Sequence, residues 1–375
     1  MSTETGIREM VERIANRLLA ATVLERIGIA VASTASALIV GVFVAAVTGY
    51  DPVALGGQLF VGSFGSEGAI LRTLRFTTIY ILTGVAVAVA FRAGVFNIGV
   101  QGQFIVGGFA CVATILVLAP AFPEGTLGGT ALVVIGTLAA VVAGGLYAAL
   151  PGVLKAYGGA NEIITTIMLN FIATGAVGWL VQGPFRAADS SAPNTERLPE
   201  TAVLPQILFD DPDFSIIGLI LTLVIVVAVA VLVSRTIFGY DMVTSGHQTT
   251  AATYAGVDAK HMIVSTMTVS GFIAGFAGAI FAIMVQGYYT DPAGIGNYGF
   301  DAIAVSLLAA NNPLGVIPAG LLFGGLESAG SYIQISSEVP IQLIDGIIGL
   351  VVLFVAVPEL FRMAAKHTRL GGENR

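Results

Sequence analysis

The chain has 375 residues, of which 56% are hydrophobic and only 10% charged, and its mean hydropathy is +0.90. Soluble domains carry roughly 25% charged residues, so this composition excludes an ordinary soluble protein. It predicts an all-α, polytopic membrane protein. The net charge is −7, and we expect no nucleic-acid partner.

Several kinds of site are excluded by residue usage. The single cysteine, Cys111, rules out a disulfide framework. The three histidines lie far apart and show no metal-ligand spacing. None of the three lysines follows a glycine, so the chain has no P-loop and does not bind ATP in that way. No metal or cofactor of the chain's own is expected.

Residues 1–26 lack the pattern of a signal peptide, because glutamates interrupt the positive region. Apolar side chains at helical spacing alternate with arginines, which predicts an amphipathic helix on the cytosolic membrane surface. The alternative is a charged tail. A second cytosolic tail is expected at 363–375.

Ten apolar runs between 27 and 362 predict about ten transmembrane segments, in a permitted range of eight to eleven. They are 27–49, 76–93, 102–119, 129–150, 163–181, 215–233, 262–286, 301–311, 313–331 and 341–360. The eighth and ninth are separated only by Asn312-Pro313, so they are half-helices or a tight hairpin.

The arginines and lysines favour cytosolic termini, because basic residues gather on the inside. With ten alternating segments, twelve basic residues fall inside and four outside. Two of the four, Arg72 and Arg75, lie close to a span and are the weakest point of this topology.

The stretch 92–104 separates two apolar runs with almost no loop. Three glycines let the backbone leave helical geometry, and Asn97, Gln101 and Gln103 can satisfy the backbone groups that this frees. Irregular backbone at membrane depth lines a cavity or is buried in protein. The stretch is therefore a wall of a transport path, or else a tight cytosolic turn.

A polar stripe follows at 159–170, where the polar side chains share roughly one helical face, namely Asn161, Glu162, Thr165, Thr166 and Asn170. A carboxylate within a span is usually functional or paired. At the expected cytosolic end of its span, however, Glu162 can equally cap the helix.

Residues 182–214 form the longest expected outside stretch, with five prolines and six acidic residues. This loop is a connector or a surface for an outside receptor.

The longest polar interruption of the C-terminal half is 234–261, which we expect on the inside. Its core, Thr249–Gly256, favours a short helix, with Gly246 and Gly256 as helix stops on either side. A short exposed helix between two spans is a docking element.

A second glycine-rich break is expected at 286–300, running into Asp301, and it contains Asn297. Two such breaks in comparable places of two halves indicate a central site in transporters built from repeats. Glu327 and Asp345 are further acids near apolar runs. Each is either a pore residue or a residue at the membrane boundary.

Several stretches together resemble the permease subunits of ABC importers for nucleosides and simple sugars, related to the ribose and branched-chain amino-acid permeases. They are FNIGVQGQ at 96–103, GANEIITTIMLN at 159–170, YAGV at 254–257, SGFIAGFAGAI at 270–280 and the stretch 299–330. The resemblance covers about 27–362.

The resemblance implies two permeases, two cytosolic ATP-binding subunits and an extracytoplasmic substrate-binding lipoprotein at the cell membrane. The permeases form a homodimer or a heterodimer, and two different chains are usual in this branch. The resemblance also implies that 244–257 is the coupling helix. The family pattern is not kept at Gln248-Thr249 and Thr253, where Asn-Pro and Arg are usual. The coupling residues expected on this basis are Gly246, Ala251, Ala252, Tyr254, Ala255 and Gly256.

Neutral substrates rich in hydrogen-bonding groups suit amides better than charges. The residues expected along the path are Asn97, Gln101, Gln103, Glu162, Thr166, Asn170, Asn297 and Asp301.

Two alternatives stay open. A stand-alone secondary transporter or channel fits the broken helices and Glu162, but a convincing pair of mid-membrane acids is missing. An intramembrane enzyme would need paired catalytic groups, and the motifs of such groups are absent.

Overall fold

A computed structural model describes residues 23–209, 211, 213–336, 340, 342–343, 346–351 and 353–354. These residues form helices and two isolated β-bridges but no β-strand, which confirms the all-α class. The expected surface helix at 1–26 falls almost wholly outside this range, as do the tail at 363–375 and Asp345. The chain forms two compact units, 63–328 and 1–62 with 329–375.

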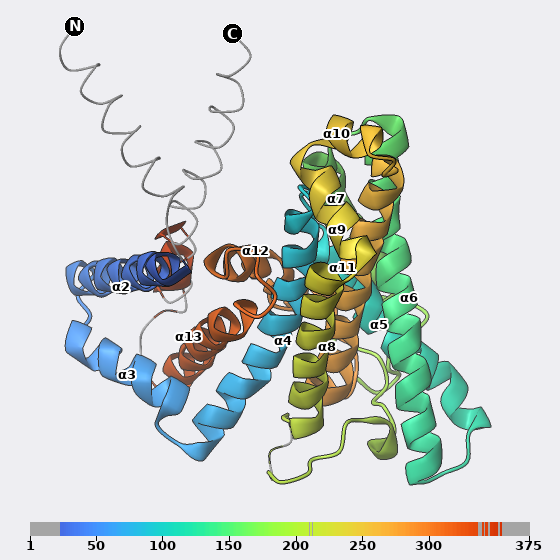
Figure 1. The fold of residues 1–375 in the computed structure, drawn as a ribbon. Coiled ribbons are helices and arrows are strands. Elements are labelled where there is room, and N and C mark those ends of the chain that lie inside the picture. The colour runs from blue at the N-terminus through green and yellow to red at the C-terminus, as the bar shows by residue number, and fades with distance from the viewer. Residues whose placement is uncertain are drawn as a thin grey trace, which may run out of the picture. The chain divides into compact units, whose positions relative to one another are not determined.

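The larger unit is a bundle of long helices (Figure 1). These are α4 (Glu67–Arg92), α5 (Val100–Leu118), α6 (Thr126–Gly158), α7 (Glu162–Gln182), α8 (Ile216–Arg235) and α11 (Ala259–Ile280), which continues as the π-helix η3 (Phe281–Gln286). Shorter helices are α9 (Ile237–His247), α10 (Thr249–Tyr254) and α12 (Tyr298–Leu308), with one-turn helices η1 (Ala119–Ala121), η2 (Glu200–Ala202) and η4 (Pro292–Gly294). Helix α13 (Val316–Ser336) also begins in this unit.

Six of the described helices are long and apolar enough to cross a membrane: α4, α5 with η1, α6, α7, α8, and α11 with η3. The predicted run at 301–311 belongs to α12, whose 11 residues extend only about 16 Å. Most of 341–360 lies outside the helices whose bounds are described.

The smaller unit contains α2 (Val23–Val47) and α3 (Pro52–Phe64). Ala45, Leu55, Ile333 and Ile347 form its buried core. Helix α3 was not predicted, because its 13 residues are too few for a span and include three glycines. Its start is stabilised by Asp51, whose Oδ1 accepts a hydrogen bond from Val53 N at 2.8 Å.

The start of α4 explains the two basic residues that fitted the topology least well. Ser66 caps this helix by accepting from Ala69 N at 3.1 Å, so Arg72 and Arg75 lie within its first turns and not in a loop. Arg75 forms an ion pair with Asp213 in the segment 182–214. This end of α4 therefore lies on the same side as that segment.

Helix α11 packs against α5 and α6 through glycines that let the backbones approach closely. A Cβ added at Gly107 of α5 would lie 2.4 Å from Gly275 Cα, and one at Gly275 would lie 2.2 Å from Ala140 O of α6. One turn along, a Cβ at Gly278 would lie 2.2 Å from Phe104 O. Because the nearest atoms are backbone, no side-chain movement can relieve these contacts.

Gly275→Ala should therefore destabilise the bundle by at least about 1–3 kcal/mol through overpacking, measured as a lower thermal unfolding midpoint in detergent. Gly175→Ala in α7 is the matched control, because an added Cβ there meets nothing within 4 Å. An unchanged midpoint for Gly275→Ala would contradict this close packing.

Candidate functional site

The predicted break at 92–104 is present between α4 and α5. Gly94 has φ +66° and ends α4, with Val95 N donating to Ala90 O at 3.1 Å. Helix α5 begins at Val100 after Gly99, which offers no capping side chain. The backbone between Gly94 and Val100 therefore needs partners from elsewhere.

Asn97 and Gln103 supply part of these partners as a reciprocal amide pair. Asn97 Nδ2 donates to Gln103 Oε1, and Gln103 Nε2 donates to Asn97 Oδ1, both at 2.9 Å. Gly99 N also donates to Asn97 Oδ1, at 3.1 Å. Asn97 also donates to Ser270 Oγ of α11 at 2.8 Å, and Ser270 donates to Ala86 O of α4 at 2.6 Å. The two amides thereby tie the break to α4 and α11.

Asn170 of α7 supplies two further partners. Its Oδ1 accepts from Gly102 N at 2.8 Å and its Nδ2 donates to Ile98 O at 2.9 Å. It acts as an N-cap for α5 provided by another helix. Thr166 lies one turn earlier on α7, completely buried, and donates to the carbonyl of Glu162 at 2.6 Å.

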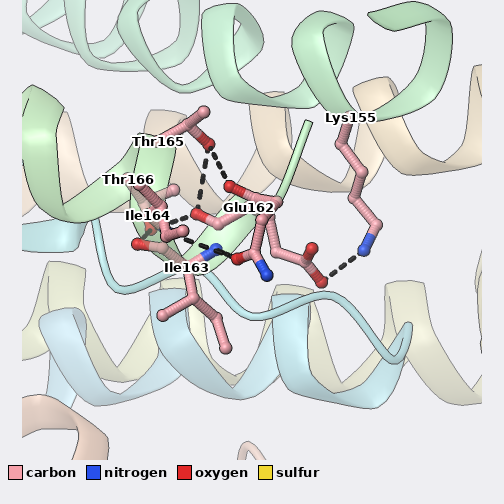
Figure 2. Close-up of polar contacts among 7 residues, drawn as sticks. Lys155, Glu162, Ile163, Ile164, Thr165 and Thr166 are labelled. Atoms are coloured by element: carbon pink, nitrogen blue, oxygen red, sulfur yellow. Dashed lines mark hydrogen bonds and ion pairs between the residues drawn. The ribbon is translucent and has the colours of Figure 1, made fainter. Parts of the chain in front are cut away.

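Glu162 lies at the junction of α6 and α7, as Figure 2 shows. It forms an ion pair with Lys155 in the last turn of α6, and the Glu162 side chain is 13% exposed. Both charges favour the helix ends that they occupy. Helix α7 is capped not by Glu162 but by Asn161, whose Oδ1 accepts from Ile163 N at 2.9 Å.

Gln101 joins the first break to the second. Its Nε2 donates to Gly296 O at 3.0 Å, and its Oε1 accepts from Gly299 N at 2.7 Å. A Cβ at Gly299 would lie 2.3 Å from Gln101 N, so the two segments are in direct backbone contact. The predicted second break thus runs from the end of η3, where Gly287 has φ +65°, to α12.

Asn297 and Asp301 stand apart from this amide network. Asn297 precedes α12 with an exposed side chain. The buried Tyr80 hydroxyl of α4 lies 3.2 Å from Asp301 Oδ2 and 3.3 Å from Glu327 Oε2 of α13. This convergence of two acids was missed, since nothing in the local sequence pairs residues on different helices.

The predicted short exposed helix is confirmed as α10, with Ala252 buried and Tyr254 90% exposed. Ala255 and Gly256 are exposed after it. Gly256 has φ +87°, and Val257 N donates to Ala252 O at 3.0 Å, so Gly256 is a helix stop as predicted. Ala251 lies within α10.

Gly246 is not a helix stop, because α9 continues through it to His247. Its small size serves another purpose: an added Cβ would lie 2.3 Å from the carbonyl carbon of Ala93. In the same way, a Cβ at Gly94 would lie 2.8 Å from Gly246 O. Helix α9 therefore lies in direct backbone contact with the first break.

This arrangement offers neutral hydrogen-bonding groups and glycine backbone around two interrupted helices. Among the described residues, no group of three or more histidine, cysteine or acidic side chains could hold a metal ion. The amides that line the breaks are largely engaged with one another, so their part in a solute path stays a prediction.

Comparison with known proteins adds independent information. The family model described as "Branched-chain amino acid transport system / permease component" matches residues 69–356. The guanosine ABC transporter permease protein NupP of Bacillus subtilis is 32% identical over 90% of this chain and 95% of its own length. The glucose ABC transporter permease protein TsgB13 of Haloferax volcanii is 31% identical over 89% and 88%. The nucleoside ABC transporter permease protein NupB of Lactococcus lactis is 28% identical over 85% and 87%.

Asn170→Leu should leave the buried Gly102 N without a partner, at a cost of about 1–3 kcal/mol, and should also remove the partner of the half-buried Ile98 O. We expect a lower unfolding midpoint and loss of transport. Thr165→Val in the same helix is the control, because its hydroxyl bonds only to its own helix. Equal stability of the two variants would contradict the capping role of Asn170.

Proposed function

The chain belongs to the family of branched-chain amino acid transport system permease components, and we propose that it forms half of a heterodimeric path for nucleosides. As a multi-pass membrane protein, it is the permease component of an ABC importer of the kind that takes up nucleosides and sugars. In such importers the ATPase activity lies in separate subunits.

A nucleoside is the proposed substrate. NupP and NupB are named for guanosine and nucleoside transport, and TsgB13, named for glucose, makes a simple sugar the second choice. Both solutes are neutral and rich in hydrogen-bonding groups, which are hydroxyls in a sugar and both hydroxyls and base nitrogens in a nucleoside, and such groups match amide and backbone groups. The breaks at 92–104 and 286–300 provide such groups, and Asn297 within the second break is exposed.

The energy source in this proposal is ATP bound by a cytosolic partner. The chain has no P-loop, whereas Tyr254, Ala255 and Gly256 form an exposed surface at the end of α10. We propose that this surface docks on an ATP-binding subunit, and that both termini and the segment 234–261 face the cytosol. The ten-segment topology over 27–362 belongs to the same proposal.

The backbone contact between Gly246 and Ala93-Gly94 is the observation that carries this mechanism. A movement of α9 and α10 cannot be absorbed by side chains at this contact, because the neighbouring atoms are backbone. The movement would first reach the break at 92–104. From there Gln101 would pass it to the second break, because Gln101 bonds to Gly296 and Gly299. This gives ATP binding a physical route to the path.

A second, different permease and a substrate-binding lipoprotein complete the proposed importer. Bacillus subtilis has two guanosine permease proteins that match this chain, NupP at 32% and NupQ at 25% identity. That pairing favours a heterodimer.

One observation favours an ion-coupled transporter as the second candidate. Asp301 and Glu327 both lie within hydrogen-bonding distance of Tyr80, and acids within the membrane often serve ion coupling. Uptake driven by an ion gradient in liposomes that hold only this chain would support it.

The test of the main proposal is purification of the tagged chain from its own membranes in mild detergent. We expect an ATPase with a P-loop and a second permease to co-purify. Nucleoside uptake by the reconstituted complex should then require ATP. Recovery of the chain alone, repeated in native lipid, would contradict the proposal.

Tyr254→Ala should reduce ATP-driven uptake by at least about tenfold, because removing a well-placed interface tyrosine costs on the order of 2 kcal/mol. Folding should not change, since the side chain is 90% exposed. Leu127→Ala, at an 85% exposed position at the other end of the bundle, is the control. Wild-type uptake in Tyr254→Ala would count against docking.

Gly246→Ala should lower the number of solutes moved per ATP hydrolysed, because its Cβ would push apart α9 and the first break. Gly158→Ala is the control, as an added Cβ there meets nothing within 4 Å. The measurement is uptake and ATP hydrolysis in the same proteoliposomes. An unchanged ratio would refute transmission through Gly246.

A further inference from the structure

Tyr298 is a buried tyrosine whose hydroxyl the fold does not use. It lies at the start of α12 and is only 7% exposed, yet its hydroxyl forms no hydrogen bond with any residue that the structure describes. Two other buried tyrosines differ, because the Tyr80 hydroxyl donates to Asp301 Oδ2 at 3.2 Å and the Tyr289 hydroxyl donates to Ile105 O at 2.9 Å. A buried tyrosine hydroxyl normally has a partner, so that of Tyr298 is available to a polar group from outside the chain.

The ring of Tyr298 is held in place by aromatic neighbours. Its centroid lies 5.5 Å from that of Tyr80 and 6.4 Å from that of Phe76, both in α4. It lies 6.0 Å from the ring of Phe104 in α5 and 5.6 Å from that of Phe281 in η3. Aromatic pairs at such distances stabilise each other's positions. The hydroxyl is therefore preorganised without a hydrogen bond of its own, which lowers the cost of binding a ligand.

The hydroxyl end of the ring faces the second break, where little of the chain covers it. Gly296 is exposed, and a Cβ added there would lie 3.1 Å from Tyr298 Cζ and 3.4 Å from its hydroxyl oxygen. The side chain of Asn297 is exposed and forms no hydrogen bond with another described residue. The Tyr298 oxygen is not fully enclosed. A solute in contact with Gly296 and Asn297 can therefore contact this hydroxyl as well.

The backbone that carries these groups is anchored on both sides. After them, Gly299 N donates to Gln101 Oε1 of the first break at 2.7 Å. Before them, the segment 193–204 pairs with the start of the second break, where Thr195 N donates to Tyr289 O at 2.8 Å. The hydroxyl therefore lies where the two breaks meet, and a movement passed between the breaks would change the access of a solute to it.

The chemistry of these groups suits a hydroxyl of a neutral solute. A phenol hydroxyl both donates and accepts hydrogen bonds, and the amide of Asn297 does the same. Glu327, Arg75 and Asp301 act electrostatically on the Tyr298 hydroxyl. Because two of these three groups are acids, an anionic group such as a phosphate is disfavoured beside them.

We propose that the Tyr298 hydroxyl and the Asn297 amide bind a sugar hydroxyl of the solute as it passes the second break. This inference rests on the proposed function, because it needs a solute that crosses the membrane along this chain. Nucleosides and simple sugars both carry such hydroxyls, so the contact serves either class. It adds Tyr298 to the predicted path residues Asn297 and Asp301.

The contact is tested by Tyr298→Phe, which removes the hydroxyl and keeps the ring among its aromatic neighbours. The measurement is uptake of radiolabelled guanosine and glucose by the complete importer in proteoliposomes with its binding protein. The uptake rate should fall about three- to tenfold, because the solute loses one hydrogen bond that replaces a bond to water. The thermal unfolding midpoint in detergent should stay unchanged, since the hydroxyl bonds to no described residue.

Tyr289→Phe is the matched control, because it removes a hydroxyl that bonds to Ile105 O and should lower the unfolding midpoint. Wild-type uptake in Tyr298→Phe would overturn the contact. So would a midpoint lowered as far as in Tyr289→Phe, because the hydroxyl would then serve the fold. If the wild-type importer took up neither solute, the proposed function would fail, which is a different result.

Access of the solute is tested by labelling in nanodiscs. Cys111 is the single cysteine of the chain and is completely buried, so the wild type is the unlabelled reference. Asn297→Cys in the assembled importer should react with a water-soluble maleimide, and guanosine-loaded binding protein with ATP should slow that reaction. Glu124→Cys, at an exposed position in the loop before α6, should react at a rate that the solute does not change. No reaction at position 297, or a rate there that guanosine leaves unchanged, would overturn the proposal.

Discussion

Backbone groups that leave a helix at membrane depth must find partners inside the protein, and this constraint shapes both interrupted regions of the chain. The first break is satisfied by side-chain amides: Asn97 and Gln103 bond to each other and to neighbouring helices, while Asn170 caps α5 from α7. The second is satisfied largely by the backbone of 193–204. Without these partners neither interruption could persist in lipid.

The two breaks contact different parts of the chain, and these parts lie at opposite ends of the bundle. The first is in backbone contact with α9 through Gly246, and the second is bonded to the segment before α8. Gln101 joins them, with one amide group donating to Gly296 and accepting from Gly299. Because the bundle around them is held by glycine contacts between backbones, movements should concentrate at the breaks and leave the helix packing unchanged.

The sequence predicted the features that depend on local composition. The helical class, the break after Arg92, the short exposed helix and the stop at Gly256 are confirmed, because glycine, amide and apolar patterns mark them directly. Features that depend on distant pairs were missed or wrong. Gly246 looked like a helix stop, but only the approach of Ala93 reveals why a side chain cannot fit there. Asp301 and Glu327 converge on Tyr80 from separate helices, which no spacing along the chain indicates.

We propose that a cytosolic ATPase acts on this permease at the surface that Tyr254, Ala255 and Gly256 form at the end of α10. A photo-reactive amino acid placed at Tyr254 in the assembled importer tests it most directly, with the same group at Leu127 for comparison. The account predicts that position 254 becomes covalently linked to the subunit that carries the P-loop, and that position 127 does not. A link to lipid alone at both positions, in membranes where ATP-driven uptake is intact, would contradict it.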